Sequence, residues 1–207
     1  MKFESLIFDI DGTLWDSRAL VAQGYNLLLA KEGLSHLSVT AEDLRPLFGK
    51  TMIEIADVLF ASIPKPDRYD LLDRCMESEG RILHADPCNI GFPGVKETLE
   101  ELAKTHRLFI VSNSQCGYPE LCMEKLGLTH LFRGHMCFGD TGTCKGETIR
   151  RLMEKHGIRS ACYIGDTMGD QEAAEYAGVP FVYCGFGFGQ SSRCWKKIDA
   201  FTDLLKL

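Results

Sequence analysis

The stretch Leu6-Ile7-Phe8-Asp9-Ile10-Asp11-Gly12-Thr13-Leu14 begins as a short apolar run and continues into two acids and a glycine. Phe3 to Phe8 is predicted to form a strand covered on both faces, because continuous apolar runs of this length suit buried strands. Along an extended chain Asp9 and Asp11 would point the same way, and at ~4 Å they would repel by roughly 4 kcal/mol at an effective dielectric of 20. A divalent cation would turn that repulsion into binding. The alternative is a simple strand-to-turn junction, where Asp-Gly is common.

Further apolar runs follow and alternate with helical patterns, several of which stop at a glycine, the expected C-terminal signal of a helix. This alternation predicts an α/β fold with a doubly wound parallel sheet. The strands are expected at 108–111, 136–138, 161–164 and 180–183, and the helices at 93–102, 119–126, 145–156 and 169–177.

Residues 15–86 break this alternation, since they hold four helical patterns and no convincing strand. Thr51 and Glu54 form a capping-box pattern at the start of one of these helices. We therefore expect a core formed by residues 1–14 and 87–207, with residues 15–86 inserted as a small all-helical domain.

Composition excludes several classes of protein. The net charge of −6 lacks the basic footprint of a nucleic-acid binder. No apolar run reaches 18 residues and the N-terminal run is too short for a secretory signal, so a soluble, cytoplasmic protein without a membrane partner is expected. Nine cysteines without a C-x-x-C pair favour reduced thiols in the core over a disulfide framework or a zinc cage.

Other chemical groups follow the later strands. Ser112-Asn113 ends one strand and Asp166 ends another, with Asp170 four residues on; Lys145 begins a helix. Each alone has an ordinary interpretation, as a turn, a helix-terminal charge or a solvated lysine. Because open parallel sheets bind ligands outside the carboxyl ends of their strands, we expect Asp9, Ser112 and Asp166 to share one edge. The glycines of 185–189 do not fit a dinucleotide fingerprint and are expected to form a loop beside that edge.

Together these motifs resemble the haloacid dehalogenase superfamily. Phe8 to Leu14 is similar to its first motif, Ser112-Asn113 to its second, Lys145 to its third and Gly165 to Asp170 to its fourth. The resemblance implies a Rossmann-like core, and the helical insert lies where the family has its type-1 cap. The insert's length resembles that of phosphoglycolate-phosphatase-like and β-phosphoglucomutase-like members.

The resemblance also implies a Mg²⁺-dependent phosphatase acting through an aspartyl phosphate. Asp9 would be the nucleophile and Asp11 the general acid and base. Both would bind the metal, Asp9 through its side chain and Asp11 through its carbonyl oxygen. Ser112, Asn113 and Lys145 would hold the phosphoryl oxygens, and Asp166 would be a metal ligand. Asp170 is expected at the metal as well, directly or through a metal-bound water, or as the group that orients Lys145.

In the insert, Lys50 falls where relatives place specificity residues, and we expect it to contact the substrate beyond the phosphate; an exposed lysine before a helix is the alternative. A helical lid favours a small phosphorylated metabolite, with no obligate protein partner implied. A phosphomutase using the same motifs and a non-catalytic module that binds phosphorylated ligands are the competing hypotheses. The natural substrate and the oligomeric state stay open.

Overall fold

The computed structural model describes residues 3–207, and its core is a six-stranded sheet in which every neighbouring pair is parallel. The strand order β3-β2-β1-β4-β5-β6 reverses direction at β1, as in doubly wound nucleotide-binding folds. The predicted α/β class is therefore confirmed. The strands are β1 Ser5–Phe8, β2 Arg107–Ser112, β3 Phe132–Cys137, β4 Ala161–Gly165, β5 Phe181–Cys184 and β6 Lys196–Ile198.

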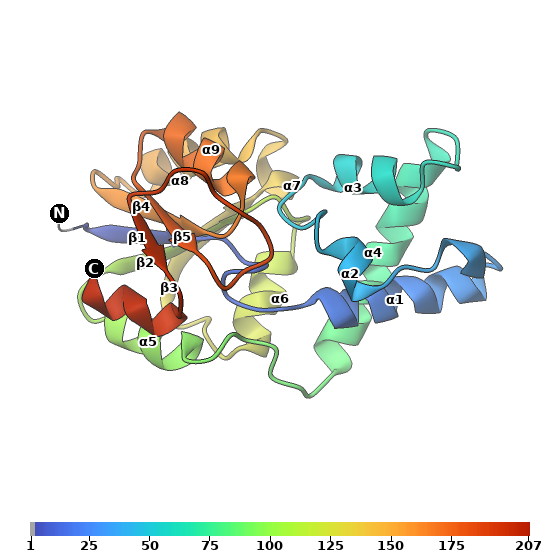
Figure 1. The fold of residues 1–207 in the computed structure, drawn as a ribbon, viewed down its shortest axis with the longest axis horizontal. Helices are drawn as coiled ribbons and strands as arrows, with labels where there is room; N and C mark the ends of the chain where they lie inside the picture. The colour runs from blue at the N-terminus through green and yellow to red at the C-terminus, as the bar shows by residue number, and fades with distance from the viewer. Residues whose placement is uncertain (1–2) are drawn as a thin grey trace.

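Helices cover both faces of the sheet (Figure 1). One face packs against a hydrophobic cluster shared with α5 (Val95–Leu102), α6 (Tyr118–Lys125) and the 3₁₀ helix η2 (Phe201–Lys206). The other packs against a second cluster shared with α8 (Lys145–Lys155) and α9 (Met168–Ala177). Since both faces are covered, the central strands are mostly apolar, which is why they were predictable from short runs of hydrophobic residues.

The edges of the sheet depart from the sequence prediction. β3 begins at Phe132, whereas the prediction placed its start at Met136. The first half of this strand was missed because it is partly exposed and carries polar residues. β6 was not expected at all, since two of its three residues are exposed lysines. Short, charged edge strands are common because they discourage pairing with another chain. A short helix, α7 (Phe138–Thr141), also follows β3 without having been predicted.

The inserted segment contains helices and no named strand, as predicted, and forms the lobe at the right of Figure 1. It has its own hydrophobic cluster, separate from the two beside the sheet. The predicted capping box is present, with the Thr51 N–H donating to Glu54 Oε2 at 2.8 Å. The elements are α1 Arg18–Lys31, η1 Ser35–Leu37, α2 Ala41–Leu44, α3 Met52–Leu59 and α4 Asp67–Ala85.

The two chain segments that join the lobes lie side by side. The Asp16 N–H donates to the Ile90 carbonyl at 2.8 Å, and the Phe92 N–H donates to the Leu14 carbonyl at 3.0 Å. We propose that residues 15–86 form a cap on a core of 1–14 and 87–207, with these crossings as the hinge. The separate cluster of the insert supports this division, although Trp15 itself packs in the cluster of the core.

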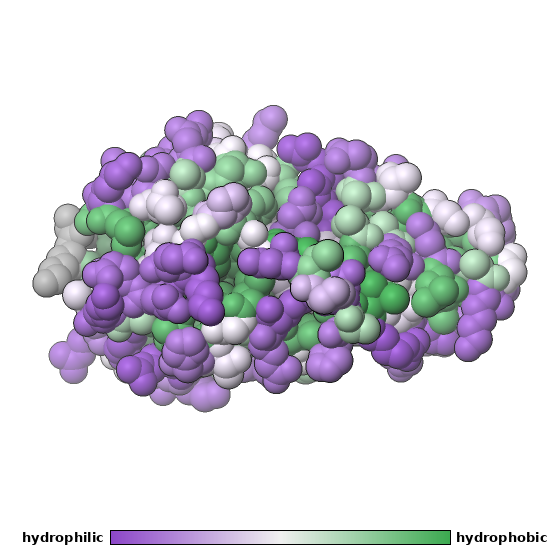
Figure 2. Space-filling model, turned by 90° about the horizontal axis from the view of Figure 1, so that it is seen from below, coloured by the Kyte–Doolittle hydropathy of each residue, from purple (hydrophilic) through white to green (hydrophobic). Residues whose placement is uncertain are grey.

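The surface seen in Figure 2 is mostly hydrophilic, with hydrophobic residues showing through in patches. Among residues 3–207, no helix combines the length and hydropathy that a membrane crossing requires. All nine cysteines are free. The expected use as small core residues holds for the five that are buried and is wrong for the four that are exposed, Cys88, Cys116, Cys144 and Cys194. The five buried cysteines are Cys75, Cys122, Cys137, Cys162 and Cys184.

Candidate active site

The carboxyl edge of three adjacent strands brings the sequence motifs together. Asp9 follows β1, Ser112 ends β2 and Asp166 follows β4, and β1 lies between the other two strands in the sheet. Lys145 is the first residue of α8. The expectation that these groups share one edge is confirmed by their positions.

A buried lysine joins two of the acids. Lys145 Nζ donates to Asp9 Oδ1 at 2.9 Å and to Asp170 Oδ1 at 2.7 Å. All three side chains are at most 4% exposed. Burial lowers the pKa of Lys145, but Asp170 and Asp9 outweigh it and hold that pKa above its ordinary value. The lysine is therefore a fixed positive charge beside Asp9.

Asp170 is fully occupied by donors from the protein. Its Oδ1 accepts from Lys145, and its Oδ2 accepts from the Thr167 hydroxyl at 2.7 Å and from the backbone N–H of Thr167 at 3.0 Å. Burial opposes ionisation of Asp170, yet Lys145 and Thr167 hold its pKa below the ordinary value. Since both oxygens already have partners, the contacts favour a role in positioning Lys145 over direct binding of a metal.

Asp166, in contrast, keeps one oxygen free. Its Oδ2 accepts from the backbone N–H of Phe188 at 2.7 Å and of Gly189 at 3.2 Å, whereas its fully buried Oδ1 has no hydrogen-bond partner among residues 3–207. Burial and the neighbouring Asp170 raise the pKa of Asp166 to about 7. The loop of residues 185–189 thus borders the site, as expected from the sequence.

This arrangement fits a divalent cation. One carboxylate oxygen from each of Asp9, Asp166 and Asp170 lies within 4.8 Å of the other two; since protein donors already occupy Asp170, a cation would bind through Asp9 and Asp166. Burial raises the pKa of Asp9 well above its usual range; Lys145 opposes this increase, while Asp170 and Asp166 add to it. An unpartnered buried oxygen beside another destabilised carboxylate is what hard cations such as Mg²⁺ and Ca²⁺ compensate.

Gly12 lets the first motif approach Asp166 closely. Its φ of +77° lies in the left-handed region, and a Cβ at this position would come within 2.2 Å of Asp166 Oδ2. Any side chain at position 12 would therefore displace the Asp166 carboxylate as well as strain the backbone. The glycine matters for the site and for the turn together.

Asp11 has an environment of its own. The chain turns immediately after Asp9, with the Leu14 N–H donating to the Ile10 carbonyl at 2.7 Å, so Asp11 lies in a turn and not on an extended strand. Asp11 Oδ1 instead accepts from Ser17 Oγ at 2.6 Å, Trp15 Nε1 at 2.8 Å and Tyr118 Oη at 2.9 Å. Burial raises the pKa of Asp11 to about 6, although these three hydrogen bonds oppose the increase.

Asn113 ties the second motif to the cap. Its Nδ2 donates to the Gly49 carbonyl at 2.7 Å, while Ser112 Oγ accepts from the Ser114 N–H at 3.3 Å. Within the described part of the chain, Asn113 Oδ1 and Ser114 Oγ are buried without a hydrogen-bond partner. Unpaired buried polar atoms are uncommon, and here they collect beside Asp9 and its neighbours, as expected where a polar ligand binds.

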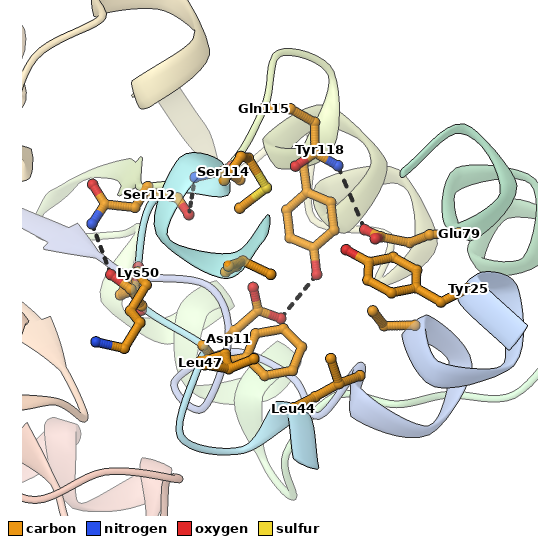
Figure 3. Close-up of a pocket in the computed structure, with 17 residues that line it drawn as sticks. Asp11, Tyr25, Leu44, Leu47, Lys50, Glu79, Ser112, Ser114, Gln115 and Tyr118 are labelled. Carbon is orange, nitrogen blue, oxygen red and sulfur yellow. Dashed lines mark hydrogen bonds between the residues drawn. The ribbon is translucent and has the colours of Figure 1, made fainter. Parts of the chain in front are cut away.

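A hollow between core and cap opens beside these groups and encloses a free volume of about 40 Å³ (Figure 3). Asp9 and Asp11 contribute to its core side. Lys50 borders it but is exposed, and Figure 3 shows its amine pointing away from Asp11 and the other labelled acid, Glu79. The predicted contact between Lys50 and the substrate stays a prediction.

Several groups at the site were not anticipated. Ser17 and Tyr118 both bind Asp11, although they lie 101 residues apart in the sequence. No local sequence pattern predicts that two such distant residues contact the same carboxylate. Glu79 is buried on α4. In the sequence, an acid in the middle of a helical pattern cannot be distinguished from one at an exposed position, so its burial could not be predicted. Burial raises the pKa of Glu79 to about 8 and Asp11 adds to this increase, while hydrogen bonds with Gln115 and Tyr25 oppose it.

Comparison with known proteins agrees with this geometry. A phosphoglycolate phosphatase of Agrobacterium fabrum is 31% identical over 192 residues, covering 88% of this chain and 80% of that protein. A 5'-nucleotidase of Pseudomonas aeruginosa is 23% identical over 209 residues, covering 93% and 87%. A crystal structure described as a predicted phosphoglycolate phosphatase from Haemophilus somnus has a TM-score of 0.81 at 24% identity, covering 100% of this chain and 98% of that chain. The family model of haloacid dehalogenase-like hydrolases matches residues 6–184, and the chain belongs to this family.

Proposed function

We propose that this hydrolase is a Mg²⁺-dependent phosphatase that cleaves a small phosphomonoester through an aspartyl phosphate on Asp9. The observation that carries the proposal is the buried carboxylate of Asp9 at the end of β1, held by Lys145 and grouped with the half-unpaired Asp166. The phosphatase names of its relatives, one of them 31% identical, support the same chemistry. None of the relatives compared above is a phosphomutase, so the mutase hypothesis is not favoured.

In the first step Asp9 attacks phosphorus. A bond forms between its carboxylate oxygen and phosphorus while the bond from phosphorus to the ester oxygen breaks. Lys145 keeps the Asp9 carboxylate oriented and adds positive charge where negative charge collects on the phosphoryl oxygens. Ser112 and the backbone N–H groups after it lie at the neighbouring strand end and would hold those oxygens.

Asp11 would move the protons. Its pKa of about 6 lies close to neutrality, where a carboxyl group exchanges protons most usefully in both directions. The protonated acid would give its proton to the departing alkoxide, and the resulting carboxylate would then accept a proton from the water that attacks the aspartyl phosphate. Trp15, Ser17 and Tyr118 fix the carboxyl group in place through Oδ1.

The metal would be held by the side chains of Asp9 and Asp166 and by the carbonyl oxygen of Asp11. When bound, Mg²⁺ would neutralise charge on the phosphoryl group and on the two carboxylates. Asp170 would serve by positioning Lys145, because its own oxygens already accept from Lys145 and Thr167.

The substrate is proposed as a class only. The relatives' names refer to phosphoglycolate and to nucleotides, and the enclosed hollow suits a small phosphorylated metabolite. The cytoplasmic location and the lack of a nucleic-acid, membrane or obligate protein partner stay predictions.

The test is release of inorganic phosphate from a panel of phosphomonoesters, with and without Mg²⁺, by wild type and Asp9→Asn. Asp73→Asn, at an exposed position on α4, is the matched control. We expect Mg²⁺-dependent phosphate release by wild type and the control, and none by Asp9→Asn. Release by Asp9→Asn at the wild-type rate would contradict the proposal, and an isomerised product without free phosphate would indicate a mutase.

A further inference from the structure

The hollow beside Asp11 has two unlike sides. Most of the cap side is apolar, and its residues come from α1, α2, α3 and the loop between the last two. The other side and the far end are polar and include Asp11, Tyr118, Gln115 and Glu79 (Figure 3). The apolar wall consists of Val21, Leu44, Leu47, Phe48, Met52 and Ile55.

Glu79 lies at the polar end of this hollow and is only 4% exposed. Its backbone is fixed by α1, since a Cβ on Gly24 would come within 2.5 Å of the Glu79 Cα, so the two helices are in close contact there. Gln115 Nε2 lies 3.5 Å from Glu79 Oε1, and the Tyr25 hydroxyl points toward the same carboxyl group in Figure 3. The side chain is therefore held facing the space next to the proposed general acid.

No cation faces Glu79 from the residues that line the hollow. Among the described residues, the one basic side chain on this lining is Lys50, which is exposed and directed elsewhere. Lys145 is already shared between Asp9 and Asp170. A carboxylate on the leaving group would thus enter a partly desolvated space without a counter-charge, next to Glu79, whose pKa, raised by burial and by Asp11, already reflects the lack of positive charge there; this is strongly unfavourable.

A hydrogen-bond donor on the leaving group would, in contrast to a carboxylate, find a partner in Glu79. An oxygen of Glu79 can accept from a hydroxyl group, and an ammonium group would favour the ionised form of the carboxyl group despite its raised pKa; hydrogen bonds to a charged partner are among the stronger ones in proteins. The free volume of about 40 Å³ exceeds the roughly 10–15 Å³ that one water needs, so the hollow suits a leaving group of a few heavy atoms. The apolar wall would pack against its carbon atoms.

We propose that Glu79 is a specificity-determining residue that selects phosphomonoesters whose short leaving group carries a hydroxyl or ammonium donor and disfavours those whose leaving group carries a carboxylate. This inference rests on the proposed phosphatase function and narrows its substrate class. It separates this chain from a strict phosphoglycolate phosphatase, because the leaving group of phosphoglycolate ends in a carboxylate.

The test is a matched series of two-carbon esters: phosphoglycolate, hydroxyethyl phosphate, aminoethyl phosphate and ethyl phosphate. We expect kcat/KM for the hydroxyethyl or the aminoethyl ester to exceed that for phosphoglycolate and for ethyl phosphate by at least about ten-fold. Glu79→Gln should reduce the preference for aminoethyl phosphate over phosphoglycolate by about ten-fold or more, and the preference for hydroxyethyl phosphate by less, since glutamine still accepts a hydrogen bond.

The control is Glu77→Gln, which removes an exposed acid two positions away on α4 and should keep the wild-type ratios. A wild-type preference for phosphoglycolate over both donor esters would overturn the inference while leaving the phosphatase function intact. An equal loss on all four esters in Glu79→Gln would also overturn it, because a merely structural residue does not change ratios between substrates. Absence of phosphate release from every ester by wild type would instead contradict the proposed function, and the inference with it.

Discussion

Replacing Asp166 by asparagine should make the metal-free protein more stable and, at the same time, remove its response to Mg²⁺. Asp166 is fully buried, and one of its oxygens has no hydrogen-bond partner in the part of the chain that the structure describes. Asparagine keeps an oxygen for the N–H groups of Phe188 and Gly189 but carries no charge. The substitution therefore removes a cost that, in our account, only a bound cation offsets.

The size of this cost follows from the raised pKa of Asp166. A rise from 3.8 to about 7 is roughly three units, or on the order of 4 kcal/mol. Burying the new amide group costs up to about 2 kcal/mol. The free energy of unfolding of the metal-free variant should therefore exceed that of wild type by about 2–4 kcal/mol. For a chain of this length, 2 kcal/mol corresponds to a rise in Tm of at least about 4 °C.

The effect depends on pH in a defined direction. Because the pKa of Asp166 is higher in the folded protein than in the unfolded chain, proton binding favours the folded state. The stability that the protonated group contributes is fully present below about pH 4 and is lost as the pH rises through about 7, where Asp166 becomes charged. The advantage of Asp166→Asn over wild type should accordingly be small near pH 4 and largest near pH 8.

The assay is thermal unfolding in a chelator and in millimolar Mg²⁺, at several pH values, with Asp73→Asn as the exposed control. Wild type and control should gain stability from Mg²⁺, and more at pH 8 than at pH 5, whereas Asp166→Asn should gain little at either. A lower Tm for Asp166→Asn in chelator at pH 8, or an undiminished gain from Mg²⁺, would refute the assignment of Asp166 as a destabilised metal ligand.

Three further outcomes are expected. Lys145→Met should lose activity and about 3–5 kcal/mol of unfolding free energy, measured in urea, since it leaves Asp9 and Asp170 buried without their cation; a loss below about 1 kcal/mol would contradict this. Asp11→Ala should lower kcat by at least about 100-fold while Mg²⁺ affinity, measured by calorimetry, stays nearly unchanged; loss of metal binding would count against its carbonyl-only role. Asn113→Ala should raise KM by about 2–10-fold with less change in kcat, because it removes the bond to the Gly49 carbonyl of the cap; an unchanged KM would show that this bond does not hold the cap in place.

The parts of the fold that could be predicted are those with a local physical cause. Strands covered on both faces appear as apolar runs. The capping box of Thr51 and Glu54 predicts the start of α3 from four consecutive residues. The rule that ligands bind at the carboxyl ends of parallel strands then placed Asp9 and Asp166 at one edge without any contact being known. The charged edge strand β6 escaped prediction because exposure removes the apolar pattern.

The parts of the site that could not be predicted depend on contacts between distant segments. Tyr118 reaches Asp11 across 107 residues, and the partners of Glu79 come from α1 and from the loop before α6. Asp9 and Asp11 both line the hollow, but the group of close carboxylates contains Asp9 and not Asp11. Residue types and strand ends can be found in a sequence, but the direction in which each carboxylate points depends on the packed structure.

The central claim is that Asp9 carries the phosphoryl group between the two steps, and chemical trapping of that intermediate tests it most directly. Asp11→Ala, which should hydrolyse the intermediate slowly, is mixed with a phosphomonoester and Mg²⁺, quenched in acid and reduced with borohydride, which converts an aspartyl phosphate into homoserine. Peptide mass spectrometry is expected to find homoserine at position 9, and none in the double variant that also carries Asp9→Asn. Phosphate release without modification at Asp9, or modification of a different aspartate, would contradict the account.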